Sequence, residues 1–274
     1  MSKLKKALEK AKEARADYEK GQLLRIEPAP PPPEPSDSTR GPQTDFKPFK
    51  PQYTTTRVVA CDSHFLRQNK VIPVCTVDGA DRLKMLRTQI LNTMSDQGRS
   101  SMIVTSANPG EGKTLTAINL AISFSHQMNK TVLLVDGDIR KPTIHKYLGL
   151  QDGPGLSDYL IGKAEIADVL VNPGMDRIAI LPGGRPLFNS AELIDSLRMK
   201  TLLKEIKGRY RDRFIIFDTA PVLTSADPLV FANFIDGILI VVEAEKTKRE
   251  ELKRALELMR DKPVIGMVFN KAID

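Results

Sequence analysis

The sequence predicts an α/β fold in which a mainly parallel sheet carries helices on both faces. Apolar runs rich in β-branched residues alternate with segments of helical periodicity from about residue 102 to residue 271. The runs are continuous, which is typical of strands covered on both faces. Several of them end in Asp or in a Gly-containing turn, and in open parallel sheets the ligand lies at these carboxyl ends. The chain therefore predicts a three-layer domain with its site where the strands end.

Length and charge limit the classes of protein that fit. The 274 residues are enough for one substantial α/β domain with appended segments. The formal net charge is +7, but no basic stripe with interleaved aromatic residues accompanies it, so nucleic-acid binding is not indicated. The two cysteines lack nearby metal-ligand partners and a disulfide framework, which favours reduced thiols in the cytoplasm. No apolar run approaches about 20 residues, so the sequence predicts no transmembrane segment.

The segment before residue 57 differs in composition from the rest. Residues 1–21 place apolar side chains near one face of a helix and Lys and Glu around it, which predicts an amphipathic helix. Such a helix docks on a partner helix, lies against an acidic membrane surface or stays solvated, and we favour docking on a partner. Residues 22–56 are Pro-rich and predict a flexible linker with an extended polyproline stretch. The globular domain is expected to span 57–274.

The periodicity of the globular domain predicts its elements in turn. Residues 81–94 predict a helix with an apolar stripe and a polar face that contains Asp81, Lys84 and Arg87. This polar face is either solvated or a charged subunit interface. Further helices are expected over 114–125, 191–210 and 248–260, where apolar residues recur at helical spacing. Strands are expected over the apolar runs 102–104, 131–136, 177–181, 214–217, 237–242 and 264–269.

The turn between the strand 102–104 and the helix 114–125 contains the most specific functional motif of the sequence. A strand, a glycine loop, Lys-Thr and a helix in this order predict a phosphate-binding loop, although Ala107 stands where the usual spacing begins with Gly. Gly110 and Gly112 lack a Cβ, so backbone N–H groups can close around a polyphosphate. Lys113 can reach the β- and γ-phosphates, and the Thr114 hydroxyl is placed to hold Mg²⁺. The predicted nucleotide-binding residues of this loop are Asn108, Pro109, Gly110, Glu111, Gly112, Lys113, Thr114 and Leu115.

Aspartates follow two of the predicted strands. Asp218 comes directly after four apolar residues, at the place where a phosphate-loop protein holds Mg²⁺ with a carboxylate, usually through water. Asp136 and Asp138 lie two residues apart, and such carboxylates repel each other unless a cation or a proton lies between them. One would assist metal binding and the other would accept a proton from an incoming hydroxyl, in an order that the residues leave open. The predicted catalytic residues are Lys113, Asp136, Asp138 and Asp218, and the predicted metal ligands are Thr114, Asp138 and Asp218.

Three stretches of the chain resemble a known family. Residues 106–114, 135–142 and 217–221 are similar to the Walker A, A′ and B motifs of the bacterial tyrosine kinases (BY-kinases) of exopolysaccharide and capsule synthesis. The resemblance covers about residues 57–271. It implies a three-layer P-loop fold that binds ATP or ADP with Mg²⁺ and phosphorylates tyrosines of its own kind or of a partner in trans. It also implies a role in exopolysaccharide biosynthesis, chain length or export.

The resemblance carries further expectations about residues and partners. By analogy with the family, Asn270 would lie near the adenine. Family members without a fused membrane segment usually work with a separate membrane-embedded chain-length regulator, which would hold this cytoplasmic chain at the inner membrane. Such kinases form homo-oligomeric rings through a helix motif that is matched here, with conservative changes, by Asp81, Lys84, Arg87 and Gln89.

Two alternative functions remain open at this point. The first is a nucleotide-switched ATPase scaffold of the polysaccharide machinery without autokinase activity. It is motivated by the lack, in these 274 residues, of the Tyr-rich C-terminal tail common in the family, which leaves Tyr53 and Tyr18 as the tyrosines expected to reach another subunit. The second is a Min/Par-type positioning ATPase. The loop of that class has a second Lys where this chain has Asn108, and Asn108-Pro109 follows the kinase pattern instead.

Overall fold

The structure, a computed structural model, describes residues 56–71, 77–95, 98–127, 130–209 and 212–272. Its strands are β1 (Arg57–Val58), β2 (Ser101–Ser106), β3 (Thr131–Asp136), β4 (Val171–Asn172), β5 (Ile178–Leu181), β6 (Arg213–Asp218), β7 (Gly237–Glu243) and β8 (Val264–Asn270). Its helices are α2 (Ser63–Gln68), α3 (Val77–Ser95), α4 (Lys113–Ser125), α5 (Ile144–Leu148), α6 (Leu156–Leu160), α7 (Ile166–Val169), α8 (Ser190–Ile194), α9 (Leu197–Arg209), α10 (Asp227–Phe231) and α11 (Arg249–Leu258).

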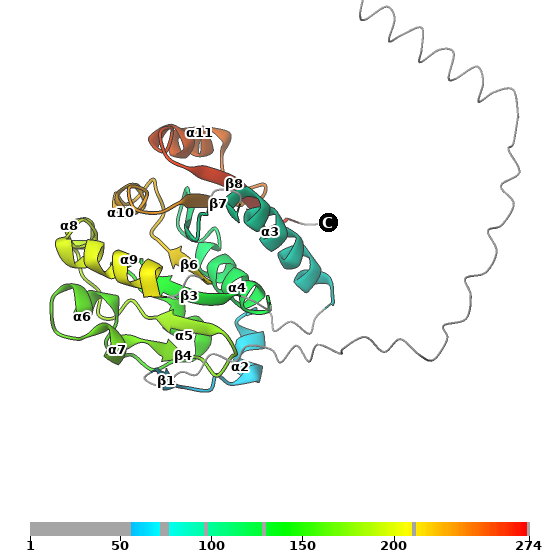
Figure 1. Cartoon of the computed structure of the whole chain (residues 1–274). Coiled ribbons are helices and arrows are strands. Elements are labelled where there is room, and N and C mark those ends of the chain that lie inside the picture. The colour runs from blue at the N-terminus through cyan, green and yellow to red at the C-terminus, as the bar shows by residue number, and fades with distance from the viewer. Residues whose placement is uncertain (1–55, 72–76, 96–97, 128–129, 210–211, 273–274) are drawn as a thin grey trace, which may run out of the picture. The chain divides into compact units, whose positions relative to one another are not determined.

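The strands form one sheet, which confirms the predicted α/β fold (Figure 1). Eight strands lie in the order β1-β4-β5-β3-β6-β2-β7-β8. Neighbouring strands pair in parallel except for β4 and β5, which pair antiparallel. The strands β2 and β3 are buried along their whole length, which explains why their sequences are apolar without alternation.

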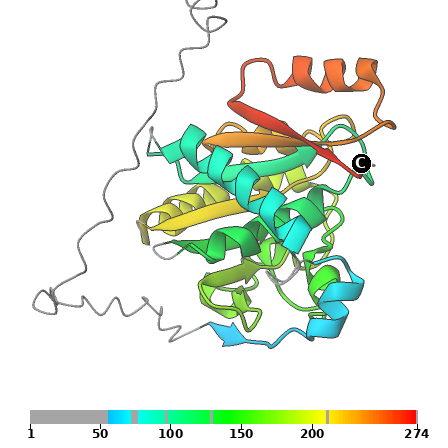
Figure 2. The same ribbon diagram turned by 90° about the vertical axis from the view of Figure 1, so that its right-hand side faces the viewer.

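Helices cover both faces of the sheet and create two apolar cores. On one face α6 to α11 pack on the strands through side chains such as Leu202, Phe231 and Ala255. On the other face α2 to α5 do so, and Figure 2 shows α3 and α4 lying across that face. Phe124 of α4 stacks there on Phe214 of β6, with ring centroids 4.5 Å apart. Together the two helical layers and the sheet are the three layers that the sequence predicts.

The position of β6 between β3 and β2 brings the motif-bearing segments together. Asp136 at the end of β3 and Asp218 at the end of β6 are direct partners in the sheet register, and Val104 of β2 pairs with Asp218 from the other side. The N–H of Gly137 donates a hydrogen bond to the carbonyl oxygen of Asp218 at 2.7 Å. The loops that leave β2 and β3 therefore flank Asp218.

Two predicted features differ from the structure. The helix expected over 191–210 is two helices, α8 and α9, because the Ser196 hydroxyl accepts a hydrogen bond from the N–H of Met199 at 3.3 Å and starts the second one. Its apolar periodicity continues across the break because Ile194 and Leu202 both face the same core. The helix expected over 81–94 begins earlier, at Val77. The segments 1–21 and 22–55, predicted as a helix and a linker, lie outside the described residues.

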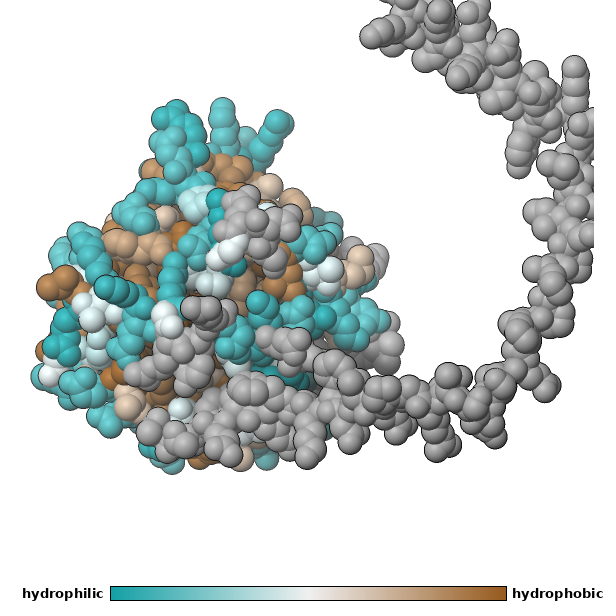
Figure 3. All heavy atoms as spheres, viewed as in Figure 1, coloured by the Kyte–Doolittle hydropathy of each residue, from teal (hydrophilic) through white to brown (hydrophobic). Residues whose placement is uncertain are grey.

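The surface of the described domain is mixed in polarity. Polar side chains project from the end of the domain where α11 lies, and Lys253, Arg254 and Glu257 of that helix are exposed (Figure 3). Apolar side chains appear between charged ones on the same face rather than as one continuous area (Figure 3). Within the described part of the chain, no helix is long and apolar enough to cross a membrane.

Candidate active site

The loop between β2 and α4 has a backbone that only glycine adopts easily at two positions. Gly110 and Gly112 have φ angles of 86° and 94°, in the left-handed region. A Cβ on Gly112 would also overlap the side-chain amide of Asn270. Gly112 is the N-cap of α4, so the unpaired N–H groups of the first helical turn face the loop. Backbone angle and close approach thus both require glycine at position 112.

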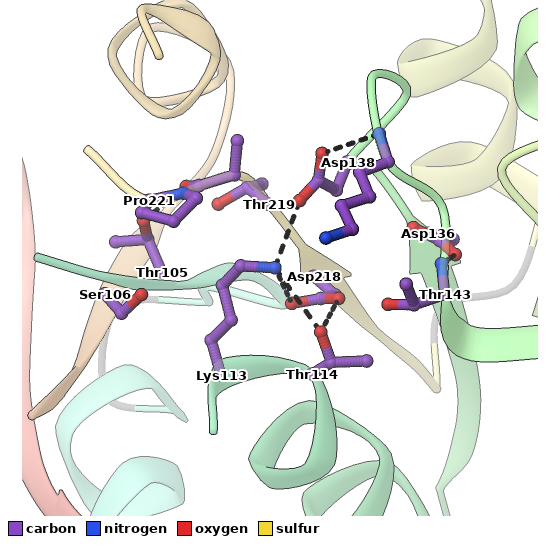
Figure 4. A network of polar contacts seen from close by, with 12 residues as sticks. Thr105, Ser106, Lys113, Thr114, Asp136, Asp138, Thr143, Asp218, Thr219 and Pro221 are labelled. Carbon is purple, nitrogen blue, oxygen red and sulfur yellow. Dashed lines mark hydrogen bonds and ion pairs between the residues drawn. The ribbon is translucent and has the colours of Figure 1, made fainter. Parts of the chain in front are cut away.

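Lys113, the first residue of α4, lies among acidic groups (Figure 4). Its Nζ is 3.2 Å from Asp138 Oδ2 and 3.5 Å from Asp218 Oδ1. The Thr114 hydroxyl donates a hydrogen bond to Asp218 Oδ2 at 2.6 Å. The structure therefore brings four of the predicted site residues into one network. They come from three elements: α4, the end of β6 and the loop after β3.

The two aspartates after β3 have different surroundings. Asp138 Oδ1 accepts a hydrogen bond from the N–H of Lys141 at 3.1 Å, and its other oxygen faces Lys113. Asp136 is fully buried, and its Oδ2 accepts hydrogen bonds from the N–H groups of Thr143 and Ile144, both at 2.9 Å. Asp136 thus closes the loop that carries Asp138.

Burial and mutual repulsion shift the pKa values of the network. Burial, followed by the charge of Asp218, raises the pKa of Asp136 to about 8. Burial also raises the pKa of Asp218, although Lys113 and the Thr114 hydroxyl oppose this shift. Burial disfavours the charged form of Lys113, but the carboxyls of Asp218 and Asp138 outweigh it and raise its pKa. At neutral pH, Asp136 is therefore largely protonated and Lys113 is charged.

A cavity of about 480 Å³ opens beside this network. The glycines of the loop, Lys113, Thr114 and Asp138 line it, whereas Asp136 does not. The sequence reasoning gave no firm role to several other lining residues, namely Arg140, Lys141, Thr143, Tyr147, Thr224 and Ser225. The sequence could have indicated these residues only by their position, since all of them follow within ten residues of Asp138 or Asp218. Cationic and hydroxyl side chains around a glycine loop form a wall suited to a polyphosphate.

A second cavity, of about 510 Å³, adjoins the first turn of α4. Leu115 and Asn270, two of the predicted nucleotide-binding residues, line it together. Leu83, Leu86 and Val268 give it apolar walls. The structure thus places Leu115 and Asn270 on a different cavity from Lys113.

Two other predicted nucleotide-binding residues direct their side chains away from the phosphate cavity. The Asn108 amide donates a hydrogen bond to Glu251 Oε2 of α11 at 3.0 Å. The Glu111 side chain is buried, and its Oε1 accepts a hydrogen bond from the Thr247 hydroxyl at 2.6 Å. These side chains tether the loop to the segment around the start of α11, so only their backbone groups remain for a phosphate.

The predicted polar face of α3 is only partly exposed to solvent. Asp81 and Lys84 form an exposed ion pair at 2.8 Å, and Gln89 is also exposed. Arg87 is half-buried and donates a hydrogen bond from Nη1 to the carbonyl oxygen of Ser123 in α4 at 2.6 Å. Arg87 therefore fastens α3 to α4.

Comparison with known proteins agrees with this geometry. Residues 101–262 match a family described as an AAA domain. The tyrosine-protein kinase YwqD of Bacillus subtilis (strain 168) is 35% identical over 193 residues, which cover 70% of this chain and 80% of that protein. The putative tyrosine-protein kinase CapB of Staphylococcus aureus is 30% identical over 194 residues, which cover 70% and 84%. The solved structure of the chimerical protein CapA2B2 has a TM-score of 0.68 at 28% identity and covers 82% of this chain and 96% of that one.

The matched region contains the phosphate loop and the three aspartates, and it ends before Asn270. It spans more than half of the chain, and the P-loop fold of the matched proteins implies nucleotide binding. The resemblance inferred from the motifs is thereby confirmed. The chain belongs to the AAA-domain family and to the bacterial tyrosine-protein kinases.

Proposed function

We propose that this chain is an ATP- and Mg²⁺-dependent protein-tyrosine kinase that phosphorylates tyrosines in trans and regulates exopolysaccharide biosynthesis. The observation that supports this most directly is the Lys113 ammonium between Asp138 and Asp218, beside the glycine loop. When a triphosphate enters the loop, Lys113 turns to its β- and γ-oxygens, and the two carboxylates are left to other cations.

The residues around Thr114 fit a magnesium ion. Mg²⁺ prefers oxygen ligands, keeps several of its waters and is usually bound through one or two carboxylates and the substrate phosphates. Thr114 Oγ1 and Asp218 are in contact and offer this donor set, with Asp138 nearby. Among the described residues, no cluster of three His, Cys, Asp or Glu side chains is placed to enclose a metal, which agrees with an ion that arrives with the nucleotide. Bound there, Mg²⁺ neutralises charge on the transferring phosphoryl group.

Asp138 is the proposed proton acceptor. The tyrosine oxygen forms a bond to the γ-phosphorus while the bond from that phosphorus to the leaving oxygen of ADP breaks, and the hydroxyl proton passes to a carboxylate. Asp138 lines the cavity and can meet the hydroxyl, whereas Asp136 is buried and holds its own proton near neutral pH. Asp136 keeps the loop closed through the amides of Thr143 and Ile144.

The adenosine is proposed to occupy the second cavity. Its apolar walls suit a purine base, and Asn270 on the same cavity adds an amide that can meet the polar edge of adenine. Leu115 lies next to Thr114, so a nucleotide whose phosphates reach Thr114 can place its nucleoside beside Leu115.

The acceptor tyrosines are proposed to come from another copy of the chain or from a partner. Tyr159 is buried in the core, which excludes it as an acceptor in the folded state. Tyr53 and Tyr18, the expected acceptors, lie outside the described residues. The exposed pair Asp81 and Lys84 on α3 offers a charged surface for a ring of copies.

The proposed partner is a membrane-embedded chain-length regulator that holds the chain at the cytoplasmic side of the inner membrane. The family resemblance supports this arrangement. Nucleic acid is not a proposed partner.

Mixing two versions of the chain tests the proposal. Wild-type protein and a Lys113→Met variant with a distinguishable mass are incubated together with Mg-ATP, and phosphotyrosine is located by mass spectrometry. We expect phosphotyrosine on the variant only when wild-type protein is present. A variant that phosphorylates itself, or a mixture in which neither chain is phosphorylated, contradicts the proposal.

The second candidate is a nucleotide-switched ATPase scaffold. It is favoured by the tyrosines of the described residues, because Tyr159 is buried and Tyr147 is half-buried on α5. A scaffold releases phosphate from ATP in the mixing experiment without forming phosphotyrosine. A positioning ATPase finds less support, because Asn108 stands in place of the second Lys and its side chain is bound to α11.

A further inference from the structure

The carbonyl groups of the phosphate loop are held by the residues where β8 ends. The Asn270 amide donates a hydrogen bond to the carbonyl oxygen of Glu111 at 2.9 Å. The Lys271 ammonium donates one to the carbonyl oxygen of Gly110, also at 2.9 Å. Asn270, the last residue of β8, and Lys271, which follows it, thus hold two consecutive carbonyls of the loop.

These contacts fix the direction of the loop amides. In a planar trans peptide the C=O and the following N–H point in opposite directions. A Gly110 carbonyl held by Lys271 therefore turns the N–H of Glu111 away from β8, and a Glu111 carbonyl held by Asn270 does the same for the N–H of Gly112. No described residue accepts a hydrogen bond from either N–H, so both are free for the oxygens of a phosphate.

We propose that Asn270 and Lys271 form a carbonyl clamp that presents the N–H groups of Glu111 and Gly112 to the diphosphate of the nucleotide. The inference rests on the proposed nucleotide binding and adds a positioning role to it. For Asn270 this role differs from the adenine contact, because the clamp acts on any ligand with a diphosphate. Gly112 is part of the arrangement, since its missing side chain leaves room for the Asn270 amide.

The position of Lys271 is set by a carboxylate on the neighbouring strand. Lys271 Nζ lies 3.0 Å from Glu243 Oε2 at the end of β7. Lys246 pairs with the same carboxylate at 3.4 Å and, within the described part of the chain, donates no hydrogen bond to the loop. The two lysines have the same charge and the same acidic partner, and they differ in the hydrogen bond to Gly110. Lys246 is therefore a matched control for Lys271.

Calorimetry of the full chain with two ligands tests the clamp. ADP and inorganic pyrophosphate are titrated, each with Mg²⁺, into wild-type protein, Lys271→Met and Lys246→Met. We expect Lys271→Met to weaken the binding of both ligands about tenfold, because a charge-assisted hydrogen bond to the loop is lost. Lys246→Met should stay within about twofold of wild type, as befits an exposed ion pair. Lys271→Arg, which keeps a donor, should recover part of the loss.

Asn270→Ala separates the clamp from a contact to the base. The clamp predicts that this variant loses affinity for pyrophosphate as well as for ADP. A contact to adenine alone predicts a weaker affinity for ADP and an unchanged affinity for pyrophosphate, and this result overturns the assignment of Asn270. Should Asn270→Ala fail to fold, Lys271→Met decides, because 48% of the Lys271 side chain is exposed and its loss leaves the core intact.

Two further results overturn the clamp itself. One is wild-type affinity of Lys271→Met for both ligands. The other is an equal loss in Lys271→Met and Lys246→Met, which would assign the effect to the charge near Glu243. Failure of the proposed nucleotide binding looks different, because wild-type protein would then bind neither ADP nor pyrophosphate.

Discussion

The two loops that flank Asp218 are held in place in different ways. The loop after β3 is closed locally, by hydrogen bonds from N–H groups three to eight residues further along to Asp136 and Asp138. The phosphate loop is held by side chains 136 to 161 residues away in the chain, from the α11 region and the end of β8. A local motif can therefore specify the first loop, whereas the second depends on the correct assembly of the sheet edge. Substitutions in the two loops should therefore differ in their effects on nucleotide affinity, activity and stability.

The largest effect is expected at the point where the phosphate loop meets β8. Gly112→Ala should lower the affinity for ADP by more than about a hundredfold, because Ala is strained at a positive φ and its Cβ would displace the Asn270 amide. Calorimetry measures the affinity. Gly208→Ala is the control: this residue of α9 has open space around it, so we expect unchanged binding and about 1 kcal/mol of added stability. An ADP affinity of Gly112→Ala equal to that of wild type would show that the distant support is unimportant.

The next largest effect is a difference in activity between variants of Asp136 and Asp138, near the loop after β3. Asp138→Asn should lower kcat for phosphotyrosine formation about a hundredfold or more, the usual contribution of a general base. Asp136→Asn should retain most of the activity, because the amide oxygen of the new side chain can still accept the hydrogen bonds from Thr143 and Ile144. Quantitative phosphotyrosine assays at saturating ATP compare the two variants. Equal losses of kcat would refute the separate roles assigned to these residues.

Asp136 should also change how the free energy of unfolding depends on pH. Its carboxyl loses its proton near pH 4 in the unfolded chain and near pH 8 in the folded one. The folded state therefore binds more protons between these values, and this group makes the free energy of unfolding fall by up to about 1.4 kcal/mol per pH unit as the pH rises. Urea denaturation from pH 4.5 to 7.5 should show a shallower decline for Asp136→Asn than for wild type. Parallel pH profiles would mean that Asp136 is ionised in the folded protein.

The smallest effect is expected for a single tether of the phosphate loop. Thr247→Val removes the hydroxyl that donates to Glu111 and accepts from the N–H of Glu243, and it should cost about 1 to 2 kcal/mol of stability. Two- to threefold weaker ADP binding should accompany it, since the other contacts to the loop remain. Thr93→Val serves as the control, because among the described residues that exposed hydroxyl donates only to the Gln89 carbonyl within α3. A larger loss in the control than in Thr247→Val would argue against the tether.

The contrast between the loops also shows what the sequence could reveal. Lys113, Thr114 and Asp218 were predictable as a set, because each lies at a fixed position beside a buried strand and parallel strands end at the same side of a sheet. The separate roles proposed for Asp136 and Asp138 were not, since they depend on which carboxyl turns toward the N–H groups at the start of α5.

The long-range contacts could not be predicted either. Nothing in the spacing of Asn270 and Lys271 reveals that they meet Gly110 and Glu111, because the pairing of β7 with β8 brings them there. The break between α8 and α9 was missed for a related reason, since both helices contribute to the same apolar periodicity. Sequence reasoning therefore identified local motifs and buried strands well, and distant tethers and short elements poorly.

ADP binding to the 274-residue chain, measured by calorimetry in Mg²⁺ and in EDTA, is the sharpest test of the proposed site. The proposed magnesium-dependent nucleotide site predicts one ADP per chain, bound more tightly with Mg²⁺ than without it, and the loss of this difference in Asp218→Asn. Absence of heat from the wild-type protein under both conditions would contradict it.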